Sequence, residues 1–308
     1  MPSQIAVLEK TPTINTISSS FGAKLSAVLE LTKARLNLSV VYSALAGYFL
    51  GVETISGLTI FYLCLGGYLV VGAANGFNQI IERDRDILMD RTKNRPLPTG
   101  RLTSLEAMIA CTLMAFLGMW MLLSINMVTA GFGAFALFMY VLVYTPLKAK
   151  GSIAVFIGAL PGAIPALLGW VAATNDFDIE PGILFALQFL WQFTHFWAIG
   201  WVADDDYKKA GYSLLPSGKR DRGTSFQILI YTIFIIPVSI LPYFAFTGAF
   251  GIGTISLILI ILMGLFLLRK AWILFKTEEV KDARKLMLAS IIYLPVVQLI
   301  YVLDKFIL

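Results

Sequence analysis

Charged residues are scarce in this sequence. Asp, Glu, Lys and Arg make up only 14% of its 308 residues, against roughly 25% in soluble domains. Hydrophobic residues make up 58%, and the mean hydropathy is +0.79. This leaves too little polar surface to cover a water-soluble globule of this length. The composition therefore excludes an ordinary soluble domain and predicts a single membrane-embedded bundle.

Cysteine and histidine are also rare. Cys64 and Cys111 lie inside apolar runs without metal-ligand spacing, so we expect packing residues rather than a disulfide. The first 24 residues are rich in Ser and Thr and lack an apolar stretch, which predicts neither a cleavable signal peptide nor a transit peptide. We expect a polar, poorly ordered tail over residues 1–30 and a single transmembrane domain over 31–308. The missing transit peptide favours a bacterial plasma membrane.

Long apolar runs, by contrast, recur along the whole chain. A helix needs about 20 apolar residues to cross the hydrocarbon core of a bilayer. Nine stretches approach that length, and they cover residues 36–52, 58–81, 105–125, 128–146, 153–173, 182–202, 225–246, 252–268 and 286–303. The fold class predicted is therefore an all-α polytopic membrane protein, with about nine transmembrane helices in one bundle.

Positive charge is confined to one face of this predicted bundle. Apart from Lys305, each of the 24 Lys and Arg residues falls before the first run or in alternate loops. Because Lys and Arg concentrate in cytoplasmic loops, the N-terminus is expected inside and the C-terminus outside. The net charge of +5 is then a property of membrane orientation, and we reject a nucleic-acid partner.

One chemically distinctive loop follows the second apolar run. Asn78, Glu82, Asp86 and Asp90 recur every four residues, so a continuing helix would place them on one stripe. Like charges at this spacing repel, so helix stability does not require them. Such oxygen ligands suit Mg²⁺, which completes its coordination with phosphate oxygens and water. The alternative interpretation is a solvated helix whose acids pair with the interleaved arginines.

A second acidic loop follows the sixth run and is expected on the same face. It contains Asp204, Asp205, Asp206 and Tyr207. A lone charged loop is usually just solvated. Two acidic loops on one face, however, predict a cradle in which Mg²⁺ bridges a substrate diphosphate and stabilises the departing oxyanion.

The only histidine, His195, lies inside the sixth apolar run. Together with Gln188 and Gln192 it forms a polar stripe at helical spacing. The glutamines are as easily explained by contacts with other helices. A histidine within the membrane suggests a haem-iron ligand, a proton carrier or a donor to a neighbouring helix. We favour a role in the substrate cavity and leave these three roles open.

These segments together resemble the UbiA superfamily of intramembrane prenyltransferases. Asn78, Glu82 and Asp86 match the family pattern Asn-x-x-x-Asp-x-x-x-Asp. Further family-like segments follow in the expected order, namely Thr32–Arg35, Met89–Thr92, Asn94–Pro96, Tyr144–Lys148, His195–Trp197 and Asp205–Pro216. The His-Phe-Trp and Asp-Arg-Thr elements distinguish the haem-modifying branch from branches that act on quinone precursors. The chain looks most like the haem-modifying branch.

The sequence departs from the family pattern at several positions. Glu82 replaces the first Asp of the acidic motif, and its longer arm still reaches a metal with altered geometry. Ala34 and Thr194 stand where Pro is expected. Ala203 and Asp204 replace basic residues, which removes diphosphate contacts and puts a site role for Asp204 in doubt.

The resemblance implies a reaction between farnesyl diphosphate and haem B, a substrate rather than a cofactor. Mg²⁺, or Mn²⁺ in its place, would assist ionisation of the diphosphate. A haem vinyl group would attack the allylic carbon, and water would complete the product, haem O. The implied partners are these two substrates, the lipid bilayer and factors of haem-copper oxidase assembly.

With this resemblance, each site residue receives an expected role. The polar residues of the two loops are assigned to Mg²⁺ and diphosphate binding, namely Asn78, Glu82, Asp86 and Asp206, with Asp90 and Asp205 as further metal ligands. Candidate diphosphate contacts are Arg91, Arg95, Lys148 and Lys209, and the residues placed near the reacting groups are Tyr207 and His195.

Three other functions remain as alternatives. A purely haem-binding membrane subunit would normally need a pair of axial ligands, and the single histidine supplies only one of them unless Met or Tyr serves as the other. A related prenyltransferase acting on an aromatic quinone precursor would not need His195. A secondary transporter is suggested by the Gly- and Pro-rich run over residues 153–173 and by a four-helix spacing of the two loops that hints at duplication. A transporter is expected to carry ionisable residues near the middle of the bilayer, whereas this chain has them at one edge.

Overall fold

The computed structural model describes residues 21–246 and 248–307, and each regular element in these ranges is a helix. The predicted tail over residues 1–30 falls largely outside the described residues, up to residue 20. Its remainder belongs to helix α1 (Phe21–Leu31), which is tied to the bundle by ion pairs from Lys24 to Glu106 and from Arg101 to Glu30.

Long helices make up most of the described chain. Their bounds are α2 (Ala34–Gly51), α3 (Gly57–Ile81), α5 (Ser104–Ile125), α6 (Met127–Phe138), α8 (Ile153–Thr174), α9 (Ile179–Val202), α11 (Arg222–Ser239), α12 (Thr254–Thr277) and α13 (Val280–Ile307). Helix α6 continues through a π-helical segment (Met139–Tyr144), α7 (Thr145–Leu147) and a 3₁₀ turn (Lys148–Lys150), and α11 is followed by a 3₁₀ turn (Leu241–Phe244). The two acidic loops contain the short helices α4 (Arg83–Asp86) and α10 (Asp204–Lys209).

Eight helical segments in the described residues are long and apolar enough to cross a membrane. They match the second to ninth predicted runs. The first predicted run corresponds to α2, which is not among the eight. Helix α2 carries Arg35 and Asn37 in its first turn, so it is less apolar than its neighbours. The structure thus supports an all-helical membrane protein without establishing a ninth span.

Two helix boundaries differ clearly from the prediction. Helix α12 continues to Thr277, so Arg269, Lys270 and Lys276 lie on a helix rather than in a loop. Helix α13 begins at Val280, six residues before the predicted start at Leu286. Hydropathy alone places the end of α12 too early and the start of α13 too late. Long basic side chains can extend from a helix towards water, so they lower the hydropathy without ending the helix.

The close packing of α2 against α8 depends on glycine. A Cβ added to Gly47 would lie 1.8 Å from Ala166 O, and one added to Gly169 would lie 1.8 Å from Ala44 O. Only hydrogen side chains allow the two backbones to approach so closely, as small residues do between membrane helices. Helix α8 therefore lies at the centre of the bundle, in contact with both α2 and α9.

Two glutamines of α9 stabilise the contact between α9 and α8. Gln188 donates to Gly162 O at 3.0 Å, and Gln192 donates to Ala159 O at 3.0 Å. These carbonyls lie in the stretch of α8 that contains Pro161. The contacts favour the helix-binding interpretation of both glutamines.

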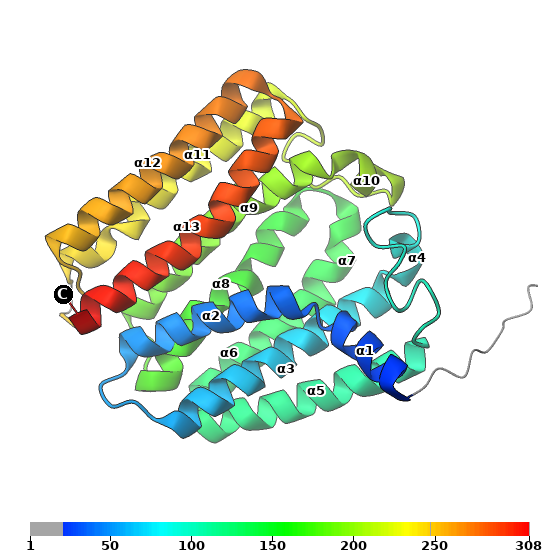
Figure 1. Cartoon of the computed structure of the whole chain (residues 1–308), viewed down its shortest axis with the longest axis horizontal. Coiled ribbons are helices and arrows are strands. Elements are labelled where there is room, and N and C mark those ends of the chain that lie inside the picture. Colours follow the sequence, from blue (N-terminus) through cyan, green and yellow to red (C-terminus); the bar gives the residue numbers. More distant parts are fainter. Residues whose placement is uncertain (1–20, 247, 308) are drawn as a thin grey trace, which may run out of the picture.

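Helices α2 and α13, which lie far apart in the sequence, pack against each other. Helix α13 lies along α9 and α2 (Figure 1). Tyr42 on α2 donates to Pro295 O on α13 at 2.8 Å, and Ser43 donates to Gln298 at 3.1 Å. The short helices α4 and α10 meet at one end of the bundle, and the α11–α12 pair forms an outer edge (Figure 1). This arrangement brings both acidic loops to one place.

Candidate active site

The first acidic loop begins where α3 ends. Glu82 adopts φ −90° and ψ 4°, which lies outside the helical region of α3. Active-site residues are often found in this sparsely populated bridge region. Asn78 therefore lies in the last turn of α3, Glu82 at the break, and Asp86 at the end of α4. All three side chains are buried, and Asn78 donates to Thr145 Oγ1 at 3.2 Å.

The predicted four-residue stripe does not extend to Asp90. Because the helix breaks at Glu82 and again after α4, Asp90 lies in a turn and its side chain is 63% exposed. This corrects the expectation of one continuous helix. The helix break does not test whether Asp90 binds a metal, so its assignment as a metal ligand stays a prediction.

The carboxylates of Glu82 and Asp86 each make one ion pair and keep one oxygen without a partner among the described residues. Lys148 Nζ lies 2.9 Å from Glu82 Oε2, and Arg95 Nη1 lies 2.7 Å from Asp86 Oδ2. Glu82 Oε1 and Asp86 Oδ1 are buried and accept no hydrogen bond from the described residues. Buried acceptors without a donor are costly, so these two oxygens fit an oxygen-seeking cation such as Mg²⁺.

The donor set is incomplete for a protein-only metal site. In the described part of the chain, no three Asp, Glu, His or Cys side chains group closely enough to hold a metal ion. Mg²⁺ commonly takes one or two carboxylates and completes its octahedron with phosphate oxygens and water. The two free oxygens therefore fit a metal that arrives with a phosphate-containing ligand.

Positive charge outweighs negative charge around these carboxylates. Lys33 lies between α1 and α2 with φ 55° and ψ 59°, a left-handed conformation that is uncommon outside glycine. Burial, together with the nearby charges of Arg95 and Lys148, lowers the pKa of Lys33 to about 7. Among the described residues, its amine makes neither a hydrogen bond nor an ion pair. Three bases face two acids here, which favours an anionic ligand.

The second acidic loop is joined to the first by Asp206. Its carboxylate accepts hydrogen bonds from the backbone amides of Asp90 at 2.8 Å and Arg91 at 3.3 Å. Lys209 bridges the loops by pairing with Asp90 and, at 3.3 Å, with Asp206. Burial alone would raise the pKa of Asp206, but these hydrogen bonds outweigh it and lower the pKa. Hydrogen bonds from Lys209 and Lys93 lower the pKa of Asp90 to about 2.

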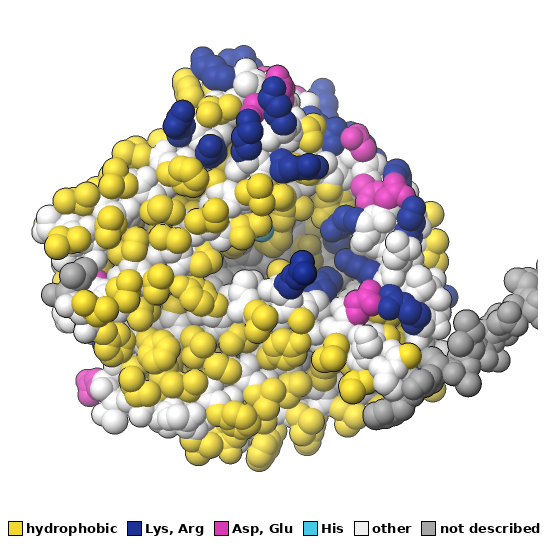
Figure 2. Space-filling view, in the orientation of Figure 1, with side chains coloured by type: hydrophobic (Ala, Val, Ile, Leu, Met, Phe, Trp, Pro, Cys, Tyr) yellow, Lys and Arg dark blue, Asp and Glu magenta, His cyan; other side chains and the backbone are white. Residues whose placement is uncertain are grey.

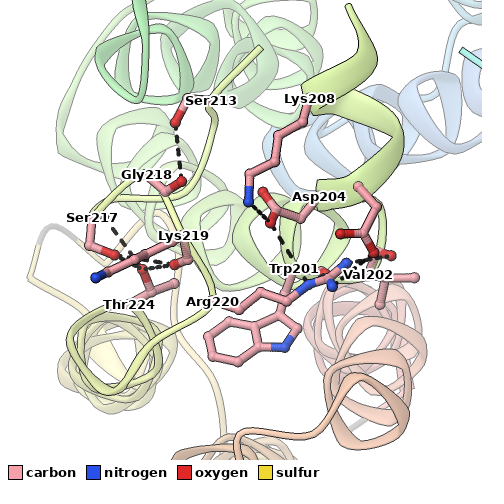
Figure 3. A network of polar contacts seen from close by, with 11 residues as sticks. Trp201, Val202, Asp204, Lys208, Ser213, Ser217, Gly218, Lys219, Arg220 and Thr224 are labelled. Atoms are coloured by element: carbon pink, nitrogen blue, oxygen red, sulfur yellow. Dashed lines mark hydrogen bonds and ion pairs between the residues drawn. The ribbon is translucent and has the colours of Figure 1, made fainter. Parts of the chain in front are cut away.

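Arg220 lies beside Asp204 (Figure 3) and also pairs with Asp205. Arg220 donates from Nε to Trp201 O at 2.7 Å and from Nη1 to Asp205 at 2.9 Å. Asp204 is buried and pairs with Lys208 at 2.6 Å. Arg220 thereby satisfies a carbonyl left free at the C-terminal end of α9. Asp205 is 80% exposed, an arrangement that does not favour its predicted role as a metal ligand.

Aromatic rings cover the basic residues of the site. The guanidinium of Arg91 lies 4.5 Å from the centre of the Tyr207 ring, and Lys148 Nζ lies 4.7 Å from that of Tyr212. Both tyrosines are buried, and their rings pack edge to face at 6.2 Å. Cation–π contacts hold these cations in place without neutralising them, so they remain available to an anion.

His195 faces α13 rather than the acidic loops. Its Nδ1 lies 2.9 Å from Ser290 Oγ, and its ring stacks on Trp191 at 4.7 Å. Trp191 in turn donates to Ser290 O at 2.7 Å. Helix α9 ends at Val202, so His195 and Asp206 do not share one continuous helix. The imidazole is held firmly and remains partly exposed.

The surface around the site is hollowed. Figure 2 shows a depression in the largely apolar face, with Lys and Arg side chains along its rim and more of them at one end of the molecule. An apolar hollow with a cationic rim suits a molecule with a long hydrocarbon tail and an anionic head.

Residues 40–292 match the UbiA prenyltransferase family. The chain belongs to the UbiA prenyltransferase family. The resemblance drawn from Asn78, Glu82, Asp86 and the segments that follow them is thereby confirmed, and the chain is an enzyme of the prenyltransferase class.

Curated members of the family are similar over nearly their whole length. A protein of Christiangramia forsetii named protoheme IX farnesyltransferase is 55% identical over 283 residues, covering 92% of this chain and 94% of that protein. A protein of the same name from Flavobacterium psychrophilum is 52% identical, covering 90% of this chain and 93% of that protein. The predicted similarity to the haem-modifying branch agrees with both names.

Solved structures, among them those of UbiA homologues, share the fold. A digeranylgeranylglyceryl phosphate synthase superposes with a TM-score of 0.77 at 22% identity, covering 92% of this chain and 99% of that chain. A UbiA homologue from Archaeoglobus fulgidus, bound to DMAPP and Mg²⁺, gives a TM-score of 0.64 at 14% identity, covering 89% of this chain and 98% of that chain. Both similarities confirm the all-helical UbiA fold.

Three residues around the UbiA-type site were not among those predicted. Lys33 lies within a segment noted for its resemblance, but the sequence gives no sign that its amine turns towards Glu82 and Asp86. Tyr212 and Arg220 follow the second acidic motif at spacings that carry no periodic signal. Their positions depend on the loop between α10 and α11, which only the folded chain reveals.

Proposed function

We propose that this chain transfers the farnesyl group of farnesyl diphosphate to a vinyl group of haem B, with addition of water, giving haem O. The observation that carries the proposal is the 55% identity to a protoheme IX farnesyltransferase over 92% of this chain and 94% of that protein. The site geometry agrees, because it combines free carboxylate oxygens, excess positive charge and an apolar hollow.

The metal is proposed to bind at the break between α3 and α4. Glu82 Oε1 and Asp86 Oδ1 would supply the protein oxygens, with Asn78 beside them. Bound Mg²⁺ would neutralise the charge that develops on the departing diphosphate. Mn²⁺ accepts the same oxygen donors. Asp90, Asp205 and Asp206 remain predicted ligands, for which the contacts described above give no support.

The diphosphate is proposed to lie against the basic residues of the same cavity. Lys33 has no acidic partner among the described residues, so its protonated amine is available to a phosphate oxygen. Arg95 and Lys148 hold Asp86 and Glu82 in place and reach towards the same space. Arg91 and Lys209 extend this positive surface across the second loop. Together they would orient the allylic carbon–oxygen bond towards the interior of the hollow.

The chemistry follows from that orientation. The carbon–oxygen bond of farnesyl diphosphate breaks, and its electron pair leaves with the diphosphate. The vinyl π electrons of haem B then form the new bond to the allylic carbon. Water adds to the resulting cationic carbon beside the porphyrin ring and loses a proton, which leaves a hydroxyethylfarnesyl group. Tyr207, one side of which is covered by Arg91, would border the allylic carbon.

Haem B is proposed to approach from the α9–α13 side. His195 is held there by Ser290 and Trp191 and presents its remaining ring edge for acceptor binding. We further propose that the product passes to factors of haem-copper oxidase assembly, as the family resemblance implies.

The orientation in the membrane is part of the proposal. We infer that α2 is a ninth span, because it is packed against α8 and α13 inside the bundle. With nine spans the N-terminus lies inside and the C-terminus outside, and both acidic loops face the cytoplasm of a bacterial plasma membrane. Residues 31–308 then form one transmembrane catalytic domain.

The decisive experiment is mass spectrometry of haems extracted from membranes that contain this protein. The membranes are supplied with haem B, farnesyl diphosphate and Mg²⁺. The expected product is haem B plus a farnesyl group and water, and a chelator should abolish it. If haem B stays unmodified while the same membranes prenylate a hydroxybenzoate, the chain belongs to the quinone branch and the proposal fails.

A further inference from the structure

Helices α11 and α12 form the outer edge of the bundle (Figure 1). A groove lies between their side chains. Its volume is about 390 Å³, and it is lined by Leu229, Ile233, Leu265, Leu268, Arg269 and Trp272. None of these residues belongs to the active site described above. The groove therefore needs an explanation of its own.

The shape of the groove follows from the packing of the two helices. A Cβ added to Gly264 would lie 2.8 Å from Ile236, so α11 and α12 touch closely at that level. Beyond it the side chains of Leu265 and Leu268 line an open apolar channel towards the end of α12. From Leu265 to Lys276 the helix rises about 16 Å, close to half of a hydrocarbon core of about 30 Å.

Unpaired positive charge surrounds one end of the groove. Arg269 is exposed and makes no ion pair within the described ranges. Arg222 lies 4.8 Å from the Phe275 ring centre, and Lys276 lies 4.9 Å from that of Trp272. Neither has an acidic partner among the described residues.

Two other basic residues at this end of the molecule form ion pairs, whereas Lys270 and Arg284 form none within the described residues. Lys281 pairs with Glu279 at 2.5 Å, and Lys285 pairs with Asp282 at 2.8 Å. Among the unpaired bases, Arg269 lines the groove itself, and Lys276 contacts Trp272 in its lining.

We propose that this groove binds one anionic phospholipid. One acyl chain lies between α11 and α12 along the leucines, and the phosphate lies among Arg269, Lys276 and Arg222. Trp272 marks the level of the headgroup, where tryptophan is favoured. A zwitterionic lipid would fill the channel but would leave the three positive charges without a net counter-charge. An apolar helix from another protein would bury those charges unpaired, which is unfavourable.

Native mass spectrometry of the full chain tests the proposal. The protein is reconstituted into vesicles of phosphatidylcholine with phosphatidylglycerol and then released in mild detergent. We expect phosphatidylglycerol to be retained in preference to phosphatidylcholine. Arg269→Gln should weaken that retention about fivefold, which is the contribution typical of one basic residue near an anionic membrane. The matched control is Lys270→Gln, since Lys270 neighbours Arg269, stacks on Phe266 and does not line the groove.

A second measurement locates the lipid. Phosphatidylglycerol with brominated acyl chains should quench the fluorescence of Trp272 more than equally brominated phosphatidylcholine does, and Trp272→Phe should remove that difference. Equal retention of both lipids, or equal losses in Arg269→Gln and Lys270→Gln, would overturn the proposal. Retention of a second protein copy in place of lipid would overturn it as well.

Discussion

The two acidic loops contain similar residues and are built differently. In the loop after α3, Glu82 and Asp86 are buried, and each keeps one oxygen without a hydrogen bond. In the loop after α9, Asp206 is committed to backbone amides and Lys209, and Asp205 is exposed and paired with Arg220. Burial with an unmet acceptor marks a place for a ligand. Asp206, which is already satisfied, instead holds the two loops together.

The strongest test of this comparison is one carboxylate from each loop. Asp86→Asn should lower kcat by about 10²- to 10³-fold, the usual loss when one group that stabilises developing charge is removed. Asp205→Asn, the control in the other loop, should change kcat less than about fivefold, because exposed ion pairs contribute little. Haem product formed per minute is measured at saturating Mg²⁺. Similar losses in both variants would show that the loops do not differ as we infer.

A pair of lysines sharpens the same contrast. Lys33→Met should raise the KM for farnesyl diphosphate roughly 10- to 100-fold, since a hydrogen bond to a charged group contributes about 1.5–3 kcal/mol. Lys208→Met should leave that KM unchanged, because Lys208 is half exposed and already paired with Asp204. Initial rates at varied diphosphate concentration supply both values. An unaltered KM in Lys33→Met would remove Lys33 from the diphosphate site.

Removal of Asp206 tests whether the second loop only holds the first. Asp206→Ala deletes the acceptor for two backbone amides of the first loop. We expect kcat/KM for the diphosphate to fall about tenfold, in line with the loss of one or two hydrogen bonds to a charged group. Limited proteolysis should then cut within residues 87–103 more rapidly than in the wild type. A loss as large as that of Asp86→Asn, with unchanged proteolysis, would make Asp206 a metal ligand.

Sequence patterns predicted the helical class well because membrane spans depend on composition. Runs of about 20 apolar residues and alternating basic loops are one-dimensional signals, so α3 was predicted to within one residue. Helix α2 was predicted as the first span, but its polar first turn leaves it outside the eight candidate spans of the described residues. The end of α12 was missed for the opposite reason, since Arg269 and Lys276 look like loop residues and lie on a helix.

The sequence predicted which types of residue form the site, but it did not predict which charged side chains pair with one another. The four-residue spacing correctly drew attention to Asn78, Glu82 and Asp86. It could not reveal that Glu82 breaks the helix and turns Asp90 towards Lys209. Lys33 is separated from the acidic loop by two helices, α2 and α3, so its approach depends on the fold. Long-range pairing of charges is set by tertiary packing, which no local spacing encodes.

His195 provides the smallest expected effect and separates acceptor from donor. His195→Ala should raise the KM for haem B a few-fold, about the change for loss of one neutral hydrogen bond, and leave the KM for farnesyl diphosphate unchanged. Ser290→Ala should give a smaller shift in the same direction, because it frees the imidazole without removing it. Rates at varied haem concentration measure both. If the haem KM is unchanged in His195→Ala, the ring is a packing residue between α9 and α13. If the diphosphate KM rises instead, the donor site extends beyond the acidic loops to α9.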